Sequence, residues 1–144
     1  MDKTSQIIDQ IYGAALDVTA WPGTLQSIQN LFDCIAAGIY TADMETGRVS
    51  LIELRGIDPG YLKRYIEEHL RDNPWTEVPD LQRPGRIRTD RSLDAFYNSP
   101  GFYHRTALYN DWMKPQDFIH TLGTNLLVER RTQTKFFIYR PRQA

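Results

Sequence analysis

The chain has 144 residues, of which 41% are hydrophobic and 24% are charged, and its formal net charge is −1. This length and composition fit one domain with a single core, so we expect residues 1–144 to form one domain. The near-zero net charge excludes a general attraction to nucleic acid or to an anionic membrane surface. No apolar run approaches the ~18 residues of a membrane span, and Cys34 is the only cysteine. We therefore expect a cytoplasmic protein without disulfides, in which Cys34 is buried and inert.

The chain begins with two amphipathic helices. Pro22 suits the first turn of the second helix. Apolar residues at helical spacing predict the core-facing side of each helix: Ile7, Ile8, Ile11, Tyr12 and Ala15 in the first, and Trp21, Leu25, Ile28 and Phe32 in the second.

Strands are predicted next, at residues 36–42 and 48–55, with a turn at residues 44–47 between them. Asp58 and Pro59 combine a capping carboxylate with a first-turn proline, and they predict a helix that runs to about Arg71. Prolines mark an irregular stretch after it, with a short strand near residues 86–89.

Ser99 and Pro100 repeat the signal for a helix start, and we expect this helix to end by Lys114. Residues 118–128 and 135–140 are predicted to close the chain as a strand hairpin. Hairpins with helices gathered between them indicate an α+β fold, in which helices pack on the faces of an antiparallel sheet.

The sequence offers little for catalysis. The three histidines, His69, His104 and His120, are too scattered for a local metal motif, and no glycine-rich phosphate loop is present. We expect no enzymatic activity, no metal site and no cofactor. One catalytic alternative remains, a small hydrolase or isomerase that pairs His120 with Asp117.

Aromatic residues with polar tips are concentrated between Tyr61 and Trp112. Such side chains suit the wall of a binding pocket, because the ring covers apolar ligand surface while the hydroxyl or indole N–H orients a polar group. The alternative is that these rings fill a small core.

Several segments resemble the PAS/GAF-like sensor domains of LuxR-type helix-turn-helix transcriptional regulators. They are Ile11-Tyr-Gly-Ala-Ala-Leu-Asp17 with Trp21-Pro22, Gly56-Ile-Asp-Pro-Gly-Tyr61, Asn73-Pro-Trp75, and Phe102-Tyr103 with Tyr109-Asn-Asp-Trp-Met-Lys-Pro-Gln-Asp117 and Ile119-His120. The resemblance implies a PAS/GAF-like fold and a small-molecule-sensing role without catalysis. It also implies a homodimer, and DNA contact only through a helix-turn-helix domain that this sequence does not contain.

A narrower resemblance is to the acyl-homoserine-lactone-binding domains of the same regulators. Tyr61, Tyr65 and Asn73-Pro74 stand where these domains have an aromatic residue, a tyrosine and an Asp-Pro pair. Two departures are evident: Tyr61 replaces a tryptophan, and Asn73 replaces the aspartate that accepts a hydrogen bond from the ligand amide. An uncharged amide holds such a bond more weakly. We therefore expect another small, partly apolar ligand.

The resemblance and the aromatic pattern together give a set of expected ligand-binding residues: Tyr40, Tyr61, Tyr65, Asn73, Trp75, Tyr109, Trp112 and His120. Ligand binding is expected to order residues 75–90 and to shift a dimer or domain equilibrium. The competing hypothesis is a protein-interaction or dimerisation module without a ligand. The basic end of the chain, which includes Lys135, is interpreted as a solvated edge.

Overall fold

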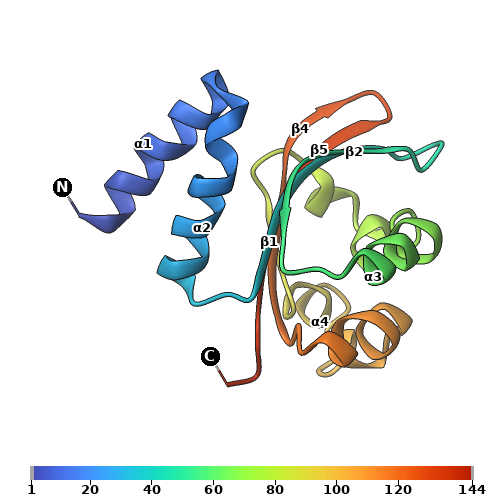
Figure 1. The fold of residues 1–144 in the computed structure, drawn as a ribbon. Helices are drawn as coiled ribbons and strands as arrows, with labels where there is room; N and C mark the ends of the chain where they lie inside the picture. The colour runs from blue at the N-terminus through green and yellow to red at the C-terminus, as the bar shows by residue number, and fades with distance from the viewer. Residues whose placement is uncertain (1, 144) are drawn as a thin grey trace.

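The structure is a computed structural model that describes residues 2–143. Its five strands form one antiparallel sheet in the order β2-β1-β5-β4-β3. Figure 1 shows α1 and α2 on one side of the sheet and α3 and α4 on the other. The α+β fold with helices on the faces of an antiparallel sheet is thus confirmed. The bounds of the elements are α1 Lys3–Leu16, α2 Trp21–Phe32, β1 Ala36–Asp43, β2 Val49–Arg55, α3 Pro59–Arg64, β3 Ile87–Thr89, α4 Ser92–Phe96, β4 His120–Glu129 and β5 Thr132–Arg140.

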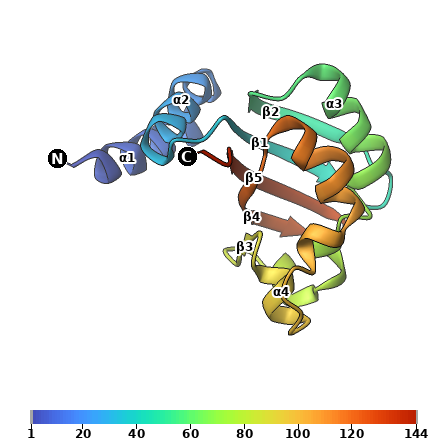
Figure 2. The same ribbon diagram turned by 90° about the horizontal axis from the view of Figure 1, so that it is seen from below.

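The two central strands, β1 and β5, divide their side chains between the two helical layers. Tyr40 on β1 lies opposite Lys135 on β5, and Gly38 lies opposite Phe137. Because side chains alternate along a strand, these residues share one face of the sheet, and Phe137 packs with Tyr40 on that face. The next residue, Ile138, packs with α2 on the opposite face. Figure 2 shows β1 and β5 side by side at the middle of the sheet.

The two N-terminal helices lie at the expected positions, but the predicted face of α1 is wrong. Ile7 is buried, whereas Ile8, Ile11 and Tyr12 are 47%, 38% and 72% exposed, and Ala15 is exposed as well. The reason is that α1 packs on α2 rather than on the sheet, so only a narrow side is covered. In α2 the predicted stripe is buried at three positions, Trp21, Leu25 and Ile28, whereas Phe32 at the end of the helix is 47% exposed.

The helix predicted from Pro59 to about Arg71 is present, but it changes from α-helical to π-helical at Tyr65. The Asp58 side chain accepts a hydrogen bond from the N–H of Gly60 at 2.8 Å, so the expected cap is in place. From Tyr65 to His69 the turn is π-helical, and the N–H of Leu70 donates to the carbonyl of Tyr65 at 2.8 Å. A π turn inserts one extra residue and therefore rotates the side chains around the helix axis.

The single helix predicted from Ser99 to Lys114 is wrong. A short helix, α4, forms before it, and the Asp94 carboxylate on α4 accepts hydrogen bonds from the N–H groups of Gly101 and Tyr103 at 2.9 and 2.8 Å. These bonds hold Ser99-Pro100 in a turn. Only a short 3-10 helix, Tyr103–Arg105, follows this turn, and the longer winding begins at Leu108–Met113, again as a π-helical segment. The closing hairpin of β4 and β5 is confirmed.

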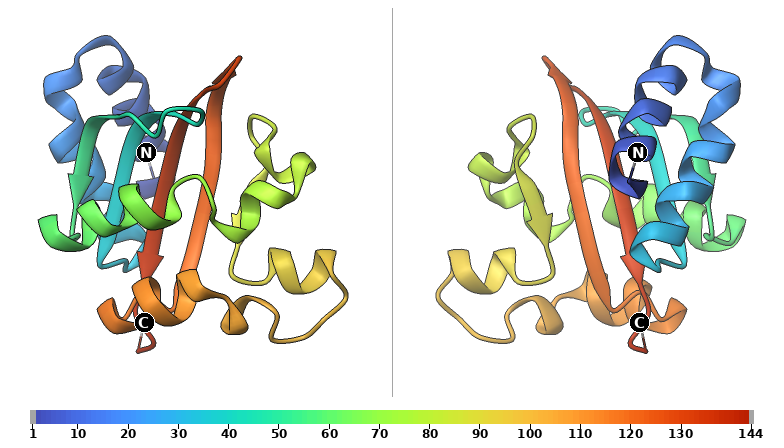
Figure 3. Two further views of the ribbon diagram at one scale, coloured as in Figure 1. Left: turned by 90° about the vertical axis from the view of Figure 1, so that its right-hand side faces the viewer. Right: turned by 90° about the vertical axis from the view of Figure 1, so that its left-hand side faces the viewer.

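In the left view of Figure 3, α3 (green) and the helical segment before β4 (orange) lie in front of the sheet, and α4 (yellow) lies beside it. Within residues 2–143 no helix is long and apolar enough to cross a membrane.

Candidate functional site

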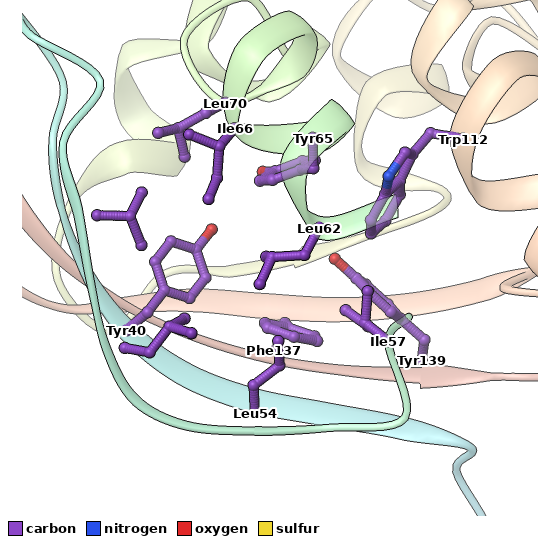
Figure 4. Close-up of a pocket in the computed structure, with 12 residues that line it drawn as sticks. Tyr40, Leu54, Ile57, Leu62, Tyr65, Ile66, Leu70, Trp112, Phe137 and Tyr139 are labelled. Carbon is purple, nitrogen blue, oxygen red and sulfur yellow. The ribbon is translucent and has the colours of Figure 1, made fainter. Parts of the chain in front are cut away.

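A cavity lies between the sheet and the helical segment that carries Tyr65, and it consists of two neighbouring chambers. The first chamber is apolar, and Figure 4 shows its side chains converging from the sheet below and the helices above. Its lining residues are Tyr40, Val49, Leu51, Leu54, Ile57, Leu62, Tyr65, Ile66, Leu70, Trp112, Phe137 and Tyr139.

The second chamber is more polar. It is lined by Tyr40, Tyr65, Asn73, Trp75, Arg88, Thr121, Leu122, Gly123, Lys135, Phe136, Phe137 and Tyr139. Four aromatic residues therefore belong to both walls: Tyr40, Tyr65, Phe137 and Tyr139. The cavity volume is about 20 Å³ in the apolar chamber and 50 Å³ in the polar one. These volumes hold single water molecules rather than an organic ligand. We refer to the four shared rings as the partition between the chambers.

The two π-helical segments each place one aromatic ring in the apolar chamber. Tyr65 begins the first segment and Trp112 lies in the second, and their ring centroids are 4.9 Å apart. The indole N–H of Trp112 donates to the carbonyl of Tyr61 at 2.7 Å. This bond joins the second segment to α3, so the upper wall of the chamber is held as one unit.

Two positively charged side chains are buried in the polar chamber. Arg88 and Lys135 are only 9% and 4% exposed. The Nη1 atom of Arg88 and the Nζ atom of Lys135 both donate to Oδ1 of Asn125, each at 3.3 Å. Burial, and secondarily the charge of Arg88, lowers the pKa of Lys135 from near 10.5 to about 7. Burial also lowers the pKa of Arg88.

The tyrosine hydroxyls of the partition stay protonated at neutral pH. Burial raises the pKa of Tyr40 and Tyr139 well above the ordinary value, and it raises the pKa of Tyr65. The hydroxyl ends of Tyr40 and Tyr65 lie toward one another in Figure 4. These hydroxyls can therefore act as neutral hydrogen-bond donors at the boundary between the two chambers.

Five of the eight expected site residues meet at this cavity. Tyr40 and Tyr65 line both chambers, Trp112 lines the apolar one, and Asn73 and Trp75 line the polar one. The amide of Asn73 already has local partners: Oδ1 accepts from the N–H of Thr76 at 3.2 Å, and Nδ2 donates to the carbonyl of Leu70 at 3.0 Å. Asn73 thus also caps the turn that carries Trp75.

The other three expected residues, Tyr61, Tyr109 and His120, line neither chamber. Tyr61 is partly buried against the core cluster that contains Trp112, and the guanidinium of Arg64 lies 5.6 Å from the centre of its ring.

Tyr109 is 5% exposed and fills the core beside Tyr103. His120 is exposed, and its Nδ1 atom lies 3.4 Å from the Asp90 carboxylate. The structure therefore pairs His120 with Asp90 and not with Asp117, whose carboxylate accepts a bond from the N–H of Arg142 at 3.4 Å.

The two buried cations, Arg88 and Lys135, are the site residues that the sequence did not reveal. The interpretation of the basic chain end as a solvated edge is wrong for Lys135. Strand alternation carried the missing signal, because it places Lys135 on the same face as Phe137 and Tyr139. No comparable pattern marks Arg88, since β3 has only three residues.

Two other kinds of functional group could carry chemistry in this chain, the single cysteine and groups of metal-binding side chains. Cys34 is buried, as predicted, and burial raises the pKa of its thiol. Residues 2–143 contain no group of three or more His, Cys, Asp or Glu side chains placed to hold a metal ion.

No protein-family model matches the sequence, and no curated protein matches it. Among solved structures, the fold is similar to that of the VqsR LBD (ligand-binding) domain from Pseudomonas aeruginosa. The match has a TM-score of 0.66 at 12% sequence identity, and it covers 94% of this chain and 79% of that chain. At this identity the likeness concerns the fold. The chain therefore shares the α+β fold of the VqsR ligand-binding domain, which is the architecture that the sequence resemblance implied.

Proposed function

We propose that this chain is the small-molecule-sensing domain of a LuxR-type transcriptional regulator, and that it binds a partly apolar ligand in the cavity between the sheet and α3. The observation that carries the proposal is the convergence of Tyr40, Tyr65, Trp75 and Trp112, from four separate segments, around one cavity. The shared fold with the VqsR ligand-binding domain supports it. In this role the chain is not catalytic, and DNA is bound through a separate helix-turn-helix domain.

The small cavity volumes indicate how a ligand would act. The rings shared by the two chambers must rotate before an organic molecule fits, and their movement would merge the chambers. A ligand that binds this open conformation more tightly shifts the population toward it.

Residues 75–90 would transmit that change. Trp75 lines the polar chamber, and its indole N–H donates to the carbonyl of Thr89 at 3.3 Å. Movement of Trp75 would therefore shift the segment between them, and with it a dimer or domain equilibrium.

Native mass spectrometry of the purified chain, followed by thermal-shift screening of a metabolite library, tests the proposal. A retained small molecule, or a stabilising compound, supports a sensing domain. Tyr65→Ala and Trp75→Ala should weaken its binding while the fold persists. Tyr97→Ala is the matched control, because Tyr97 is 40% exposed and stacks on Phe102 outside both chambers. Unchanged affinity in both pocket variants would remove these residues from the site.

A second candidate function, dimerisation without a ligand, is favoured by the exposed side of α1 and the segment after it. Large apolar side chains recur there at helical spacing, and Leu16 and Val18 are 92% and 69% exposed. Such a stripe is typical of an interaction surface. We propose a homodimer through it.

Size-exclusion chromatography with light scattering tests this second candidate with the variant Tyr12→Glu/Leu16→Glu. A dimer that becomes monomeric supports the interface. A chain that is monomeric before substitution contradicts it. The candidate replaces the sensing function only if native mass spectrometry and the thermal-shift screen also detect no ligand.

A further inference from the structure

The polar chamber contains two buried cations without a buried acid to balance them. No acidic group of residues 2–143 lies within 4.0 Å of the charged nitrogens of Arg88 or Lys135. Their shared partner is one neutral amide oxygen, Oδ1 of Asn125, and Arg88 also donates to Oε1 of Gln82 at 3.4 Å. Burying an unpaired charge is costly. A negatively charged group bound between these two side chains would therefore be strongly stabilised.

The surroundings of the two cations do not supply such a group. No Asp, Glu or His is among the described residues that line either chamber. Thr121 adds a polar group to the wall of the polar chamber: it is 7% exposed, and its hydroxyl lies near that of Tyr103 but has no hydrogen-bond partner within 3.5 Å. An ammonium, a guanidinium and a hydroxyl thus line one small chamber, and all three can donate hydrogen bonds.

The sheet explains why these donors lie together. Lys135 is directly opposite Tyr40 on one side and Asn125 on the other. Arg88 is opposite Gly123, and a Cβ atom at position 123 would lie 3.6 Å from Nη2 of Arg88. The guanidinium thus lies over the strand at Gly123, at ordinary van der Waals distance from the position of an added Cβ atom. The donors are therefore positioned by the rigid sheet and not by a mobile loop.

We propose that the ligand of this site is an amphipathic organic anion, with its acidic head group between Arg88 and Lys135 and its hydrocarbon body in the apolar chamber. This inference rests on the proposed sensing function and names its ligand class. A carboxylate is the simplest head group, because a guanidinium and an ammonium bind it through charge-assisted hydrogen bonds. The apolar chamber adjoins the polar one through the shared rings, and leucine and isoleucine side chains dominate the rest of its wall.

The proposal has a pH signature. An anion binds best when Lys135 carries its proton, and the depressed pKa of about 7 means that the free protein loses that proton within the neutral range. The other ionisable groups of the chambers are Arg88 on β3, whose guanidinium keeps its charge in proteins, and Tyr40, Tyr65 and Tyr139, whose raised pKa keeps them neutral from pH 6 to 9. Affinity for a fully ionised ligand should therefore fall as the pH rises from 6 to 9.

Isothermal titration calorimetry with octanoate and its neutral isostere octanamide tests the head group. We expect octanoate to bind about 10- to 100-fold more tightly at pH 6, as for a charge-assisted pair. Lys135→Met and Arg88→Gln should each reduce this ratio by about tenfold or more. Lys114→Met is the matched control, because Lys114 is exposed and lies outside both chambers.

The outcomes separate this inference from the proposed function. Equal or tighter binding of octanamide overturns the anionic head group and leaves the sensing function intact. Failure of both probes to bind also overturns the anion proposal, and native mass spectrometry then decides whether a different molecule is sensed. Circular dichroism of Arg88→Gln checks its fold, and the Lys135→Met variant provides an independent test if Arg88→Gln does not fold.

Discussion

The Nζ atom of Lys135 lies 3.3 Å from Oδ1 of Asn125, the same oxygen that accepts a hydrogen bond from Arg88. Lys135 and Asn125 are directly opposite one another on β5 and β4. The two cations share one acceptor oxygen of a neutral amide, and this amide supplies no negative charge to balance them. The burial of these two charges without a countercharge lowers the stability of the fold, and groups perturbed in this way are typical of functional sites.

The first prediction concerns stability and pH. Lys135 is charged in both folded and unfolded chains below about pH 7, so the cost of its burial is then complete. Between about 7 and the unfolded pKa near 10.4, only the unfolded chain keeps the proton, so the contribution of Lys135 to stability rises with pH. Lys135→Met should be more stable than the wild type by about 1–4 kcal/mol at pH 6, and this gain should shrink toward pH 10.

Urea denaturation at several pH values measures this effect, with Lys114→Met as the exposed control. The control should leave the free energy of unfolding unchanged within ~0.5 kcal/mol. A gain for Lys135→Met that is constant from pH 6 to 10 would show that the lysine does not titrate in this range in the folded chain.

The sequence predicted the order of helices and strands well, because hydrophobic spacing, caps and prolines are local signals. Asp58-Pro59 is an example, since the carboxylate caps Gly60 as expected. The helix predicted at Ser99-Pro100 was wrong because the carboxylate of Asp94, on the preceding short helix, binds N–H groups that follow this turn. No sequence pattern at Ser99-Pro100 indicates that another side chain will bind the backbone N–H groups there.

The site was predictable only in part for a related reason. An aromatic residue on a helix can line the cavity or pack elsewhere, and its contacts with segments far away in the sequence determine which. Tyr65 therefore lines the cavity, whereas Tyr61, four residues earlier, does not. Arg88 and Lys135 were missed because a charged residue is expected at the surface.

The second prediction concerns Gly56, which follows β2. Its φ is +84°, and a Cβ atom there would lie 2.1 Å from the carbonyl oxygen of Ile35. Because the obstacle is backbone, it cannot rotate away. Gly56→Ala should lower the free energy of unfolding, and by more than about 1 kcal/mol beyond the loss that the unfavourable φ alone would cause.

Gly85→Ala provides the matched control for this measurement. Gly85 has a similar φ of +81° but nothing within 4 Å of the added Cβ atom. The difference in unfolding free energy between the two variants isolates the steric term. Equal costs for both would mean that the chain near Ile35 can move aside.

The third prediction concerns Cys34. It is 8% exposed, and burial raises the pKa of its thiol. Because the thiolate is the reactive form, a disulfide reagent should modify native protein much more slowly than protein in urea. Absorbance of the released thiol measures both rates, and comparable rates would indicate frequent local opening between α2 and β1.

The fourth prediction concerns the close approach of Gly38 and Phe137, which are paired across β1 and β5. A Cβ atom at position 38 would lie 2.5 Å from Cε1 and 2.6 Å from Cζ of the Phe137 ring. The ring belongs to the partition between the two chambers, so Gly38→Ala must displace a wall of the site. We expect a loss of about 1–3 kcal/mol from overpacking.

A double-mutant cycle with Phe137→Leu shows whether that ring is the cause. Leucine removes the outer edge of the ring, so the added methyl group of Gly38→Ala then has space. The double variant should be more stable than the sum of the two single effects predicts, by at least about 0.5 kcal/mol. Additive costs would place the strain elsewhere, for example at Cδ1 of Leu54, 2.9 Å from the added atom.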